Sequence, residues 1–300
     1  MNSKKDKRRI EKKSSRTAAF TCVCRASSFY EKIPYYKSND YIAPRLLPRF
    51  FHPLIKSKRI RSLLLKKIGP KGIYEYVIAR TKVIDEIFLN AVLNNFDQIL
   101  LFGAGFDSRG IRLIGTNEKI AIFELDVTTT ISDKLKQYKK RKIDPGKVLY
   151  VEIDFNTEKI EDKLKSIGFQ YNKKTLYILE GITMYLNESA VNNDFKFITD
   201  SAGKGSEVVF DYIYQSVLEE KNLYYGEREI YQRVKKDGEG WTFGLLEGEI
   251  RNFLQDRGLE LIKNWDSLKL QENYFQDKNR NIVGKINGTH CIVHAKVKDF

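Results

Sequence analysis

The chain has 300 residues, 42% of them hydrophobic, which is enough for one large α/β domain or two small ones with a sizeable core. Its 53 Lys and Arg residues against 39 acidic ones give a net charge of +14. The apolar run at 17–24 is too short for a signal peptide or a membrane span and is followed by Arg25, and no other run reaches spanning length.

Residues 1–16 carry eight basic and two acidic residues, a block of like charge that predicts a solvated, disordered tail. Contact of this tail with nucleic acid or another acidic surface is the alternative. The other +8 is interpreted as spread thinly over the chain. Three cysteines, an odd and small number, argue against a disulfide framework and for the reducing cytoplasm. Cys22 and Cys24 have no second ligand pair at suitable spacing, so no metal site is expected.

Residues 17–97 hold five of the six prolines and show no strand alternation, which predicts an N-terminal helical cap broken by turns. Its most regular helix is predicted over 72–95, where apolar residues recur at helical spacing.

From residue 98 onward, short apolar runs alternate with amphipathic stretches, the pattern of parallel strands buried on both faces. Strands are predicted at 98–102, 120–124, 148–153, 175–179 and 207–211, and helices at 107–114, 129–141, 157–167 and 187–201. The alternation predicts an α/β fold with a doubly wound sheet and right-handed crossovers. Two more strands, 260–264 and 291–297, give an expected seven-stranded, mostly parallel sheet. The last strand follows the turn pair Asn287-Gly288 and is expected as an antiparallel hairpin partner.

We therefore expect a single domain over 17–300, with a cofactor-binding core at 98–212 and C-terminal strands at 247–300. Between them, residues 213–246 form an aromatic and charged insertion, which we interpret as a lid over the active site. A helical insertion that packs on the surface without a substrate role is the alternative.

The first predicted strand runs directly into Phe102-Gly103-Ala104-Gly105-Phe106-Asp107. Glycines at such a turn let the backbone bend sharply and approach a nucleotide. The third glycine of the dinucleotide fingerprint is missing, because Ser108 follows Asp107. This departure argues against a nicotinamide dehydrogenase.

Acidic residues end the next three predicted strands, at the sheet edge where open α/β folds bind ligands. A carboxylate at the end of the second strand is placed to accept ribose hydroxyls, but Glu124 and Asp126 share a face and alternation cannot choose between them. Asp154 beside Phe155 suits an adenine, whose amine the acid accepts while the ring lies against the base. Glu180 ends the fourth strand.

Three motifs together resemble the leucine carboxyl methyltransferase family, and in particular its bacterial O-methyltransferase branch. They are Gly103-Ala104-Gly105-Phe106-Asp107-Ser108-Arg109, Phe123-Glu124-Leu125-Asp126 and Glu180-Gly181-Ile182-Thr183-Met184-Tyr185-Leu186. Cys24-Arg25-Ala26, Ala79-Arg80-Thr81 and Gly240-Trp241-Thr242-Phe243-Gly244 extend the resemblance over about 17–297. It implies a class I, Rossmann-like methyltransferase fold with S-adenosylmethionine as cofactor.

The resemblance also implies roles for individual residues. These are Arg80 and, as a second partner, Arg25 for the methionine carboxylate, Gly103 for the backbone turn, Asp126 rather than Glu124 for the ribose, Asp154 with Phe155 for the adenine, and Glu180 for the methionine amino group. The family often carries a smaller apolar residue at the position of Phe155, a departure that concerns only the adenine contact.

The predicted function is an O-methyltransferase that modifies a carboxylate or hydroxyl of a small molecule or peptide end. An ionised carboxylate needs no general base, whereas a hydroxyl would. No catalytic residue is assigned, because His52, His290 and His294 are interpreted as core or surface residues. A nucleic-acid methyltransferase using the tail, or a non-catalytic cofactor-binding module, are the alternatives. The Glu180 motif is not the Asn/Asp-Pro-Pro-Tyr type, so nucleic acid is not expected as a partner, and neither is a membrane.

Overall fold

The computed structural model describes residues 16–114, 119–238 and 240–298. The predicted tail lies outside the described residues except for Arg16, which is the first residue of helix α2 (Arg16–Phe29). Arg16, predicted as the last residue of the tail, is therefore helical.

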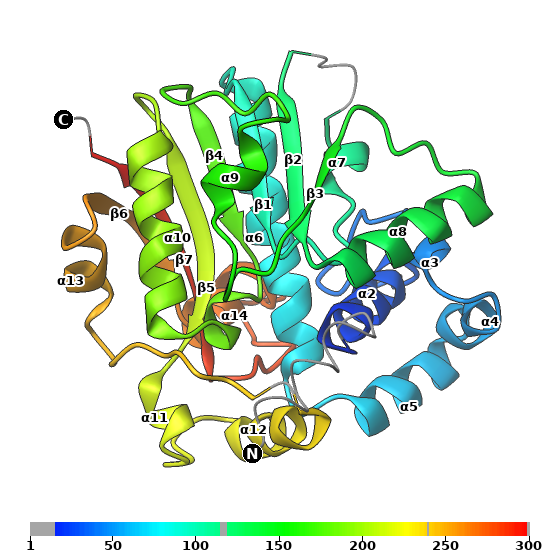
Figure 1. Cartoon of the computed structure of the whole chain (residues 1–300). Coiled ribbons are helices and arrows are strands. Elements are labelled where there is room, and N and C mark those ends of the chain that lie inside the picture. Colours follow the sequence, from blue (N-terminus) through cyan, green and yellow to red (C-terminus); the bar gives the residue numbers. More distant parts are fainter. Residues whose placement is uncertain (1–15, 115–118, 239, 299–300) are drawn as a thin grey trace.

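The N-terminal cap is helical throughout its regular elements, as predicted. After α2 come α3 (Ala43–Leu46), α4 (Phe51–Lys56), α5 (Lys58–Ile68) and α6 (Ile73–Leu93). The predicted helix at 72–95 corresponds to α6, which buries twelve of its 21 residues, including Ile84 and Phe88. This helix packs along the sheet and connects the cap to the core (Figure 1).

A seven-stranded, mostly parallel sheet forms the centre of the molecule and confirms the predicted fold class. The strands are β1 (Gln98–Phe102), β2 (Ala121–Asp126), β3 (Leu149–Glu152), β4 (Thr175–Leu179), β5 (Glu207–Ile213), β6 (Leu259–Trp265) and β7 (His290–Val297). They lie in the order β3-β2-β1-β4-β5-β7-β6. Every residue of β1 and β4 is buried, which explains why both strands read as continuous apolar runs.

Strand β7 is antiparallel to both of its neighbours, β5 and β6, but it is not a tight hairpin partner as predicted. Helix α14 (Ser267–Tyr274) and a long loop separate it from β6. Asn287 and Gly288 lie in this loop, where the side chain of Asn287 donates to the carbonyl of Lys71 at 3.0 Å. The turn pair thus fixes the loop to the start of α6.

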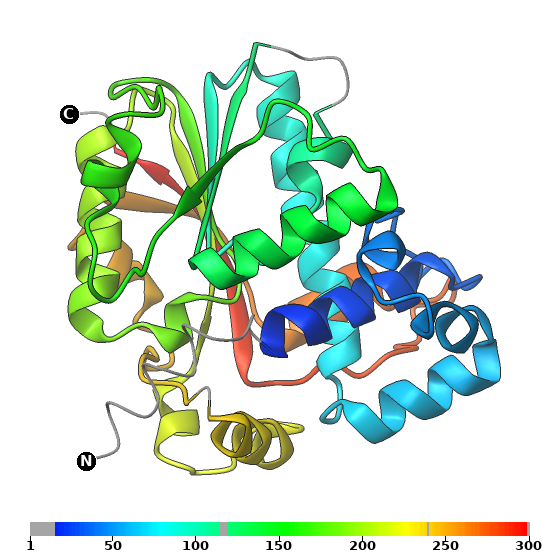
Figure 2. The ribbon, with the colours of Figure 1, turned by 45° about the vertical axis from the view of Figure 1, so that its right-hand side comes forward.

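The remaining helices cover the sheet on both faces. They are α7 (Arg109–Arg112), α8 (Thr128–Arg141), α9 (Ile160–Leu164), α10 (Glu188–Ser201) and α13 (Ile250–Gln255). Turned by 45°, the sheet is seen between α9 and α10 on one side and α6 on the other (Figure 2). This layered arrangement is the doubly wound architecture expected from the alternating pattern.

The insertion at 213–246 contains two helices, α11 (Gln215–Leu218) and α12 (Glu227–Asp237). The buried carboxylate of Glu227 accepts hydrogen bonds from the backbone N–H groups of Asn222, Leu223 and Tyr224, which fixes the turn before α12. A short 3₁₀ helix, η1 (Thr183–Tyr185), follows β4.

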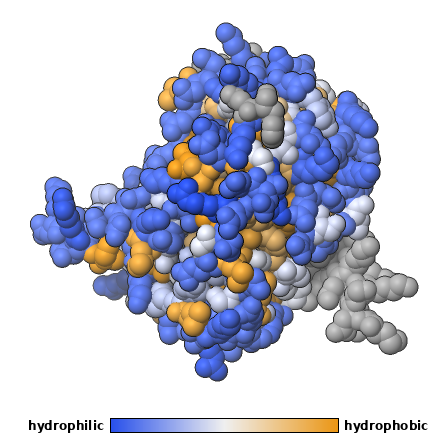
Figure 3. Space-filling model, turned by 90° about the vertical axis from the view of Figure 1, so that its left-hand side faces the viewer, coloured by the Kyte–Doolittle hydropathy of each residue, from blue (hydrophilic) through white to orange (hydrophobic). Residues whose placement is uncertain are grey.

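No helix in the described ranges is long and apolar enough to cross a bilayer. On the side of α13, hydrophobic residues lie interspersed among hydrophilic ones (Figure 3).

We predict that the buried carboxyl of Asp194, on α10, makes stability depend on pH. Burial raises the pKa of Asp194 to about 8, with a smaller contribution from Glu161. Its Oδ2 has no hydrogen-bond partner among the described residues. The folded state therefore holds a proton that the unfolded state loses near pH 4, so stability falls as the pH rises from about 4 to about 8.

Asp194→Asn replaces the protonated acid by a neutral amide of similar shape. Thermal melts should show a Tm at least about 2 °C above wild type at pH 8 and a clearly smaller difference at pH 5. Asp200→Asn, at an exposed position of the same helix, serves as control. Equal effects of Asp194→Asn at both pH values would contradict the prediction.

Candidate functional site

A cavity of about 940 Å³ opens at the carboxyl ends of β1 to β4. This volume lies near the upper end of the roughly 300–1,000 Å³ typical of small-molecule sites. All seven residues predicted to contact the cofactor line it: Arg25, Arg80, Gly103, Asp126, Asp154, Phe155 and Glu180. The fold therefore gathers into one space the residues that the sequence placed on separate elements.

The turn after β1 has the geometry that its glycines predict. Gly103 and Gly105 have φ angles of 59° and 52°, in the left-handed region that favours glycine. A Cβ on Gly103 would lie 2.8 Å from Cδ1 of Ile182, so a side chain there would displace the cavity wall. The turn can thus bring bare backbone close to a ligand.

Asp126 lies on the cavity wall, whereas Glu124 does not. Its Oδ2 accepts the N–H of Gly105 at 2.6 Å and its Oδ1 the N–H of Val127 at 2.7 Å. Burial raises the pKa of Asp126 above its usual range, and these two hydrogen bonds oppose the rise. Each oxygen retains a lone pair for a ligand hydroxyl.

Glu124 serves a different purpose, because its carboxylate pairs with the buried ammonium of Lys134 on α8. Burial raises the pKa of Glu124 to about 7, although the pair with Lys134 lowers it. The two acids share a face of β2 but differ in what lies over them. α8 covers Glu124, and the strand end leaves Asp126 open to the cavity.

The end of β3 contributes an acid and an aromatic ring. Asp154 is partly exposed, and its Oδ1 accepts the N–H of Asn156 at 3.0 Å. The ring of Phe155 stacks on Phe102 of β1, with centroids 5.8 Å apart and planes 24° apart. Phe155 is therefore held in place by a residue of β1, and it lines the cavity.

Arg80, from the middle of α6, lies between two carboxylates. Its Nε is 3.0 Å from Oε1 of Glu180, and its Nη1 donates to Oδ2 of Asp211 at 2.6 Å. Asp211 is fully buried at β5 and also accepts the hydroxyl of Tyr76 and the N–H of Gly181. The contact with Asp211 is a hydrogen bond, whereas Nε of Arg80 is buried without a hydrogen-bond partner among the described residues, so the guanidinium keeps donor capacity for a ligand anion.

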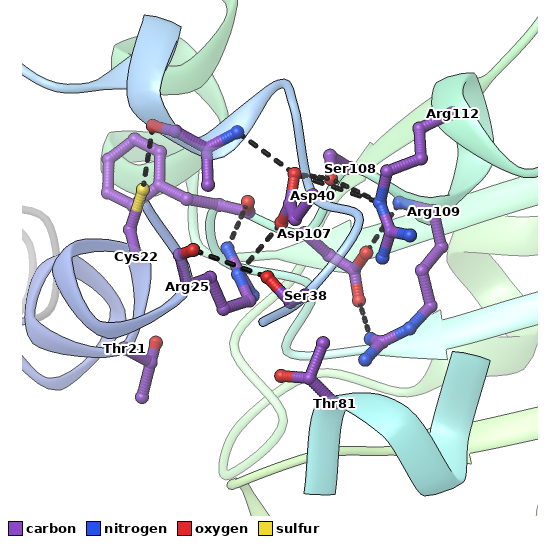
Figure 4. A network of polar contacts seen from close by, with 12 residues as sticks. Thr21, Cys22, Arg25, Ser38, Asp40, Thr81, Asp107, Ser108, Arg109 and Arg112 are labelled. Atoms are coloured by element: carbon purple, nitrogen blue, oxygen red, sulfur yellow. Dashed lines mark hydrogen bonds and ion pairs between the residues drawn. The ribbon is translucent and has the colours of Figure 1, made fainter. Parts of the chain in front are cut away.

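Arg25, from α2, is also buried and fixed by the protein. Its Nη2 donates to the carbonyl of Phe106 at 2.6 Å, and its Nε lies 3.1 Å from Oδ2 of Asp40. Asp40 in turn accepts the hydroxyl of Ser108 at 2.8 Å and lies 3.7 Å from Nε of Arg112 (Figure 4). The guanidinium groups of α2 and α7 therefore share one carboxylate.

Arg109 connects these groups and is only 1% exposed. Its Nε donates to Asp85 at 2.7 Å, and its Nη1 pairs with Asp107 and, at 2.6 Å, with Oε2 of Glu180. Burial tends to raise the pKa of Asp107, but the guanidinium groups of Arg109 and Arg25 outweigh this effect and hold that pKa below its usual range. Arg109 thus fixes the side chain of Glu180 from the side opposite Arg80.

Nine side chains form one continuous set of ion pairs, which we call the buried ion-pair network. It contains four arginines and five acids, none more than 15% exposed: Arg25, Asp40, Arg112, Asp85, Arg109, Asp107, Glu180, Arg80 and Asp211. With every member ionised, the network carries one excess negative charge.

Sequence reasoning missed part of this site. Asp211 ends the fifth predicted strand in the same way as the acids that were singled out, so its position was a usable signal. Asp40 and Asp85 gave no such signal, because they lie in the cap and meet their partners only in three dimensions. The first turns of α2 were also missed, although Thr17, Ala18 and Thr21 line the cavity.

The insertion reaches the cavity at only two described residues, Gly238 and Gly240. The segment after them is fixed to η1, since the N–H and hydroxyl of Thr242 donate to Met184 and Leu186. Trp241 packs edge-on against His290, which is itself stacked on Tyr76. Burial and Arg80 lower the pKa of His290 to about 3, which agrees with its interpretation as a core histidine.

Comparisons with known proteins identify the family. The sequence model of the family described as leucine carboxyl methyltransferase matches residues 37–199, more than half of the chain. "Putative S-adenosyl-L-methionine-dependent methyltransferase YktD" of Bacillus subtilis is 24% identical over 224 residues, which cover 73% of this chain and 72% of that protein.

A relative from Mycobacterium tuberculosis with the same type of name is 33% identical over 137 residues, which cover 44% of this chain and 41% of the relative. Apart from YktD, the chain thus spans about half the length of the first relatives it matches. Among solved structures, an O-methyltransferase family protein from Burkholderia thailandensis has 10% identity and a TM-score of 0.48, over 89% of this chain and 75% of that one.

The family model and the relative from Bacillus subtilis confirm the resemblance to the leucine carboxyl methyltransferase family. The chain is an S-adenosylmethionine-dependent methyltransferase and belongs to the leucine carboxyl methyltransferase family.

Proposed function

We propose that this protein is an O-methyltransferase that transfers the methyl group of S-adenosylmethionine to a carboxylate or hydroxyl of a small molecule or a peptide end. The observation that carries the proposal is the single cavity in which the strand-end acids Asp126, Asp154 and Glu180 face Arg25 and Arg80. Its volume of about 940 Å³ allows a cofactor and a small acceptor to lie side by side.

The donor set fits the cofactor part by part. The two free lone pairs of Asp126 suit the ribose hydroxyls, and Asp154 with Phe155 suits the adenine. The guanidinium groups of Arg80 and Arg25 suit the methionine carboxylate, while Glu180 suits the amino group. Ile182 packs so closely on Gly103 that no side chain fits at position 103. At this turn the methionine segment of the cofactor would therefore meet the backbone of Gly103.

The charge of the buried ion-pair network supports the same assignment. S-adenosylmethionine has a sulfonium, an ammonium and a carboxylate, a net charge of +1, which complements the excess negative charge of the network. A dinucleotide carries negative phosphates in place of the sulfonium and ammonium, so it lacks this complementarity to the network. This electrostatic difference agrees with the missing third glycine after β1.

We assign the remaining part of the cavity, lined by α2, Tyr185, Leu186 and Gly240, to the acceptor. Methyl transfer is an in-line displacement, for which the cofactor supplies an activated methyl group when bound. The protein's task is to hold the acceptor oxygen in line with that methyl and to exclude water. Arg16, at the start of α2, lines this part and complements an acceptor that carries a carboxylate.

We also propose a cytoplasmic location, supported by three buried cysteines that are all free thiols. A small molecule or peptide carboxylate is the proposed partner.

We predict that Asp126 contributes more to cofactor affinity than Glu124. A charged acceptor bond contributes roughly 1.5–3 kcal/mol, so Asp126→Ala should weaken S-adenosylmethionine binding by about tenfold to several hundredfold in calorimetric titration. Glu124→Gln, which keeps the shape of a residue outside the cavity, should change Kd by less than about threefold.

Thermal melts of both variants confirm that they are folded. A greater loss of affinity in a folded Glu124→Gln protein would overturn the assignment of the ribose to Asp126. If the protein bound NADH and showed no response to S-adenosylmethionine, the assignment of this cavity to S-adenosylmethionine would be overturned.

We predict that methyl groups are transferred to oxygen. The protein is incubated with methyl-tritiated cofactor and a panel of short peptides with free carboxyl ends and of hydroxybenzoic acids. Carboxyl methylation gives an ester, from which mild alkali releases volatile tritiated methanol, whereas a methylated hydroxyl retains its label. Asp126→Ala should reduce either product by at least about tenfold at subsaturating cofactor.

Label that is stable to alkali and lies on nitrogen or sulfur would contradict O-methylation. Tight cofactor binding with no transfer to any metabolite extract would instead support the non-catalytic binding module.

A further inference from the structure

The segment from residue 41 to residue 74 contains nine basic residues and no acidic one. With +6 in the tail and +14 in the whole chain, this leaves −1 for all other residues. The interpretation that the charge outside the tail is spread thinly is therefore wrong. The segment coincides with α3, α4 and α5, so the basic charge lies on one part of the cap.

Only some of these basic residues are used inside the protein. Arg61 is 2% exposed and pairs with Glu31 at 2.8 Å, and Arg45 donates to the carbonyl of Arg141. In contrast, Arg49, Lys56, Lys58 and Arg59 are exposed. Helices α4 and α5 lie at the periphery of the molecule in both ribbon views, away from the sheet (Figures 1 and 2).

Large apolar side chains are exposed among these charges. Phe50 is 67% exposed next to Arg49, and on α5 Leu63 is 56% and Ile60 43% exposed. Ile60 and Leu63 are three residues apart and so share a face of the helix, with Arg59 adjacent in sequence. Leu65 and Arg61 point into the protein instead. The outward face of α5 therefore combines aliphatic and cationic groups.

We propose that this surface, defined by Arg49, Phe50, Lys56, Lys58, Arg59, Ile60 and Leu63, binds the surface of an anionic lipid bilayer. Lysine and arginine are attracted by lipid phosphates, and aliphatic side chains gain free energy by leaving water for the acyl boundary. RNA would satisfy the same cations, but it is held by stacking on aromatic planes and offers little to leucine or isoleucine. The two aliphatic residues therefore favour lipid.

Such binding is peripheral and needs no spanning helix, so it agrees with the absence of one in the described ranges. The expectation that a membrane is not a partner rested on the lack of spanning segments and did not consider a surface contact. The cytoplasmic face of a cell membrane is negatively charged, and its attraction for basic residues decays within about one Debye length. Binding should accordingly be sensitive to salt.

The test is co-sedimentation of the full chain with vesicles of equal parts phosphatidylglycerol and phosphatidylcholine, and with phosphatidylcholine alone, at increasing salt. We expect binding to the anionic vesicles only, weakened by salt. The double variants Ile60→Ser with Leu63→Ser, and Lys58→Glu with Arg59→Glu, should each lower the partition coefficient by about tenfold or more. Leu268→Ser, at a 65% exposed position of α14, is the matched control and should change nothing.

Two further arms separate the alternatives. Lys4→Glu with Lys5→Glu tests the tail, and loss of binding in this variant alone would overturn the proposal in favour of the tail. A single-stranded RNA probe tests nucleic acid. The proposal would also be overturned if the protein bound RNA and did not bind vesicles. In that case the charge reversal should abolish RNA binding and the serine variants should leave it intact. Circular dichroism confirms that each variant is folded. Cofactor affinity should stay unchanged in the variants of α5 and α14, because none of the four substituted α5 residues nor Leu268 lines the described wall of the cavity.

Discussion

The structure depends on one constraint, that a buried charge must be paired. The nine charged side chains of the network lie where several elements meet: α2, the residues before α3, α6, the turn after β1 with α7, and the ends of β4 and β5. Removing one partner from such a set typically costs about 3–5 kcal/mol, because the opposite charge is left in a low dielectric. All these elements must therefore be in place together. The helical cap is for this reason part of the site and not a separate covering.

Much of the fold was predictable because burial leaves a strong pattern. The limits of β1 and β4 were predicted to the residue, since strands buried on both faces are continuous apolar runs between polar segments. The strand-end acids could be placed together because the carboxyl ends of parallel strands meet at one edge. The sequence could not choose between Glu124 and Asp126, because the difference is made by Lys134, ten residues later, on the helix that covers one of them.

Other features could not be predicted because their causes lie far apart along the chain. Arg109 meets Asp85 and Glu180, and no spacing rule connects these positions. The insertion was expected to cover the cavity, yet α2 supplies more of its described wall, and only Gly238 and Gly240 of the insertion reach it. Asn287-Gly288 suggested a hairpin by local turn chemistry, but tertiary contacts with Lys71 and Tyr225 determine its position.

The strand order β5-β7-β6 has a consequence for how the protein folds as it is made. β6 precedes β7 in the chain but pairs with no other strand, so residues 259–265 have nothing to pair with until the last strand has left the ribosome. β1 to β5 can pair with one another earlier, because each already has a neighbour in the nascent chain. Completion of the sheet is therefore a late event, because it pairs β5 with a strand far along the sequence. Until then the edge of β5 stays open, and it can pair with strands of other chains.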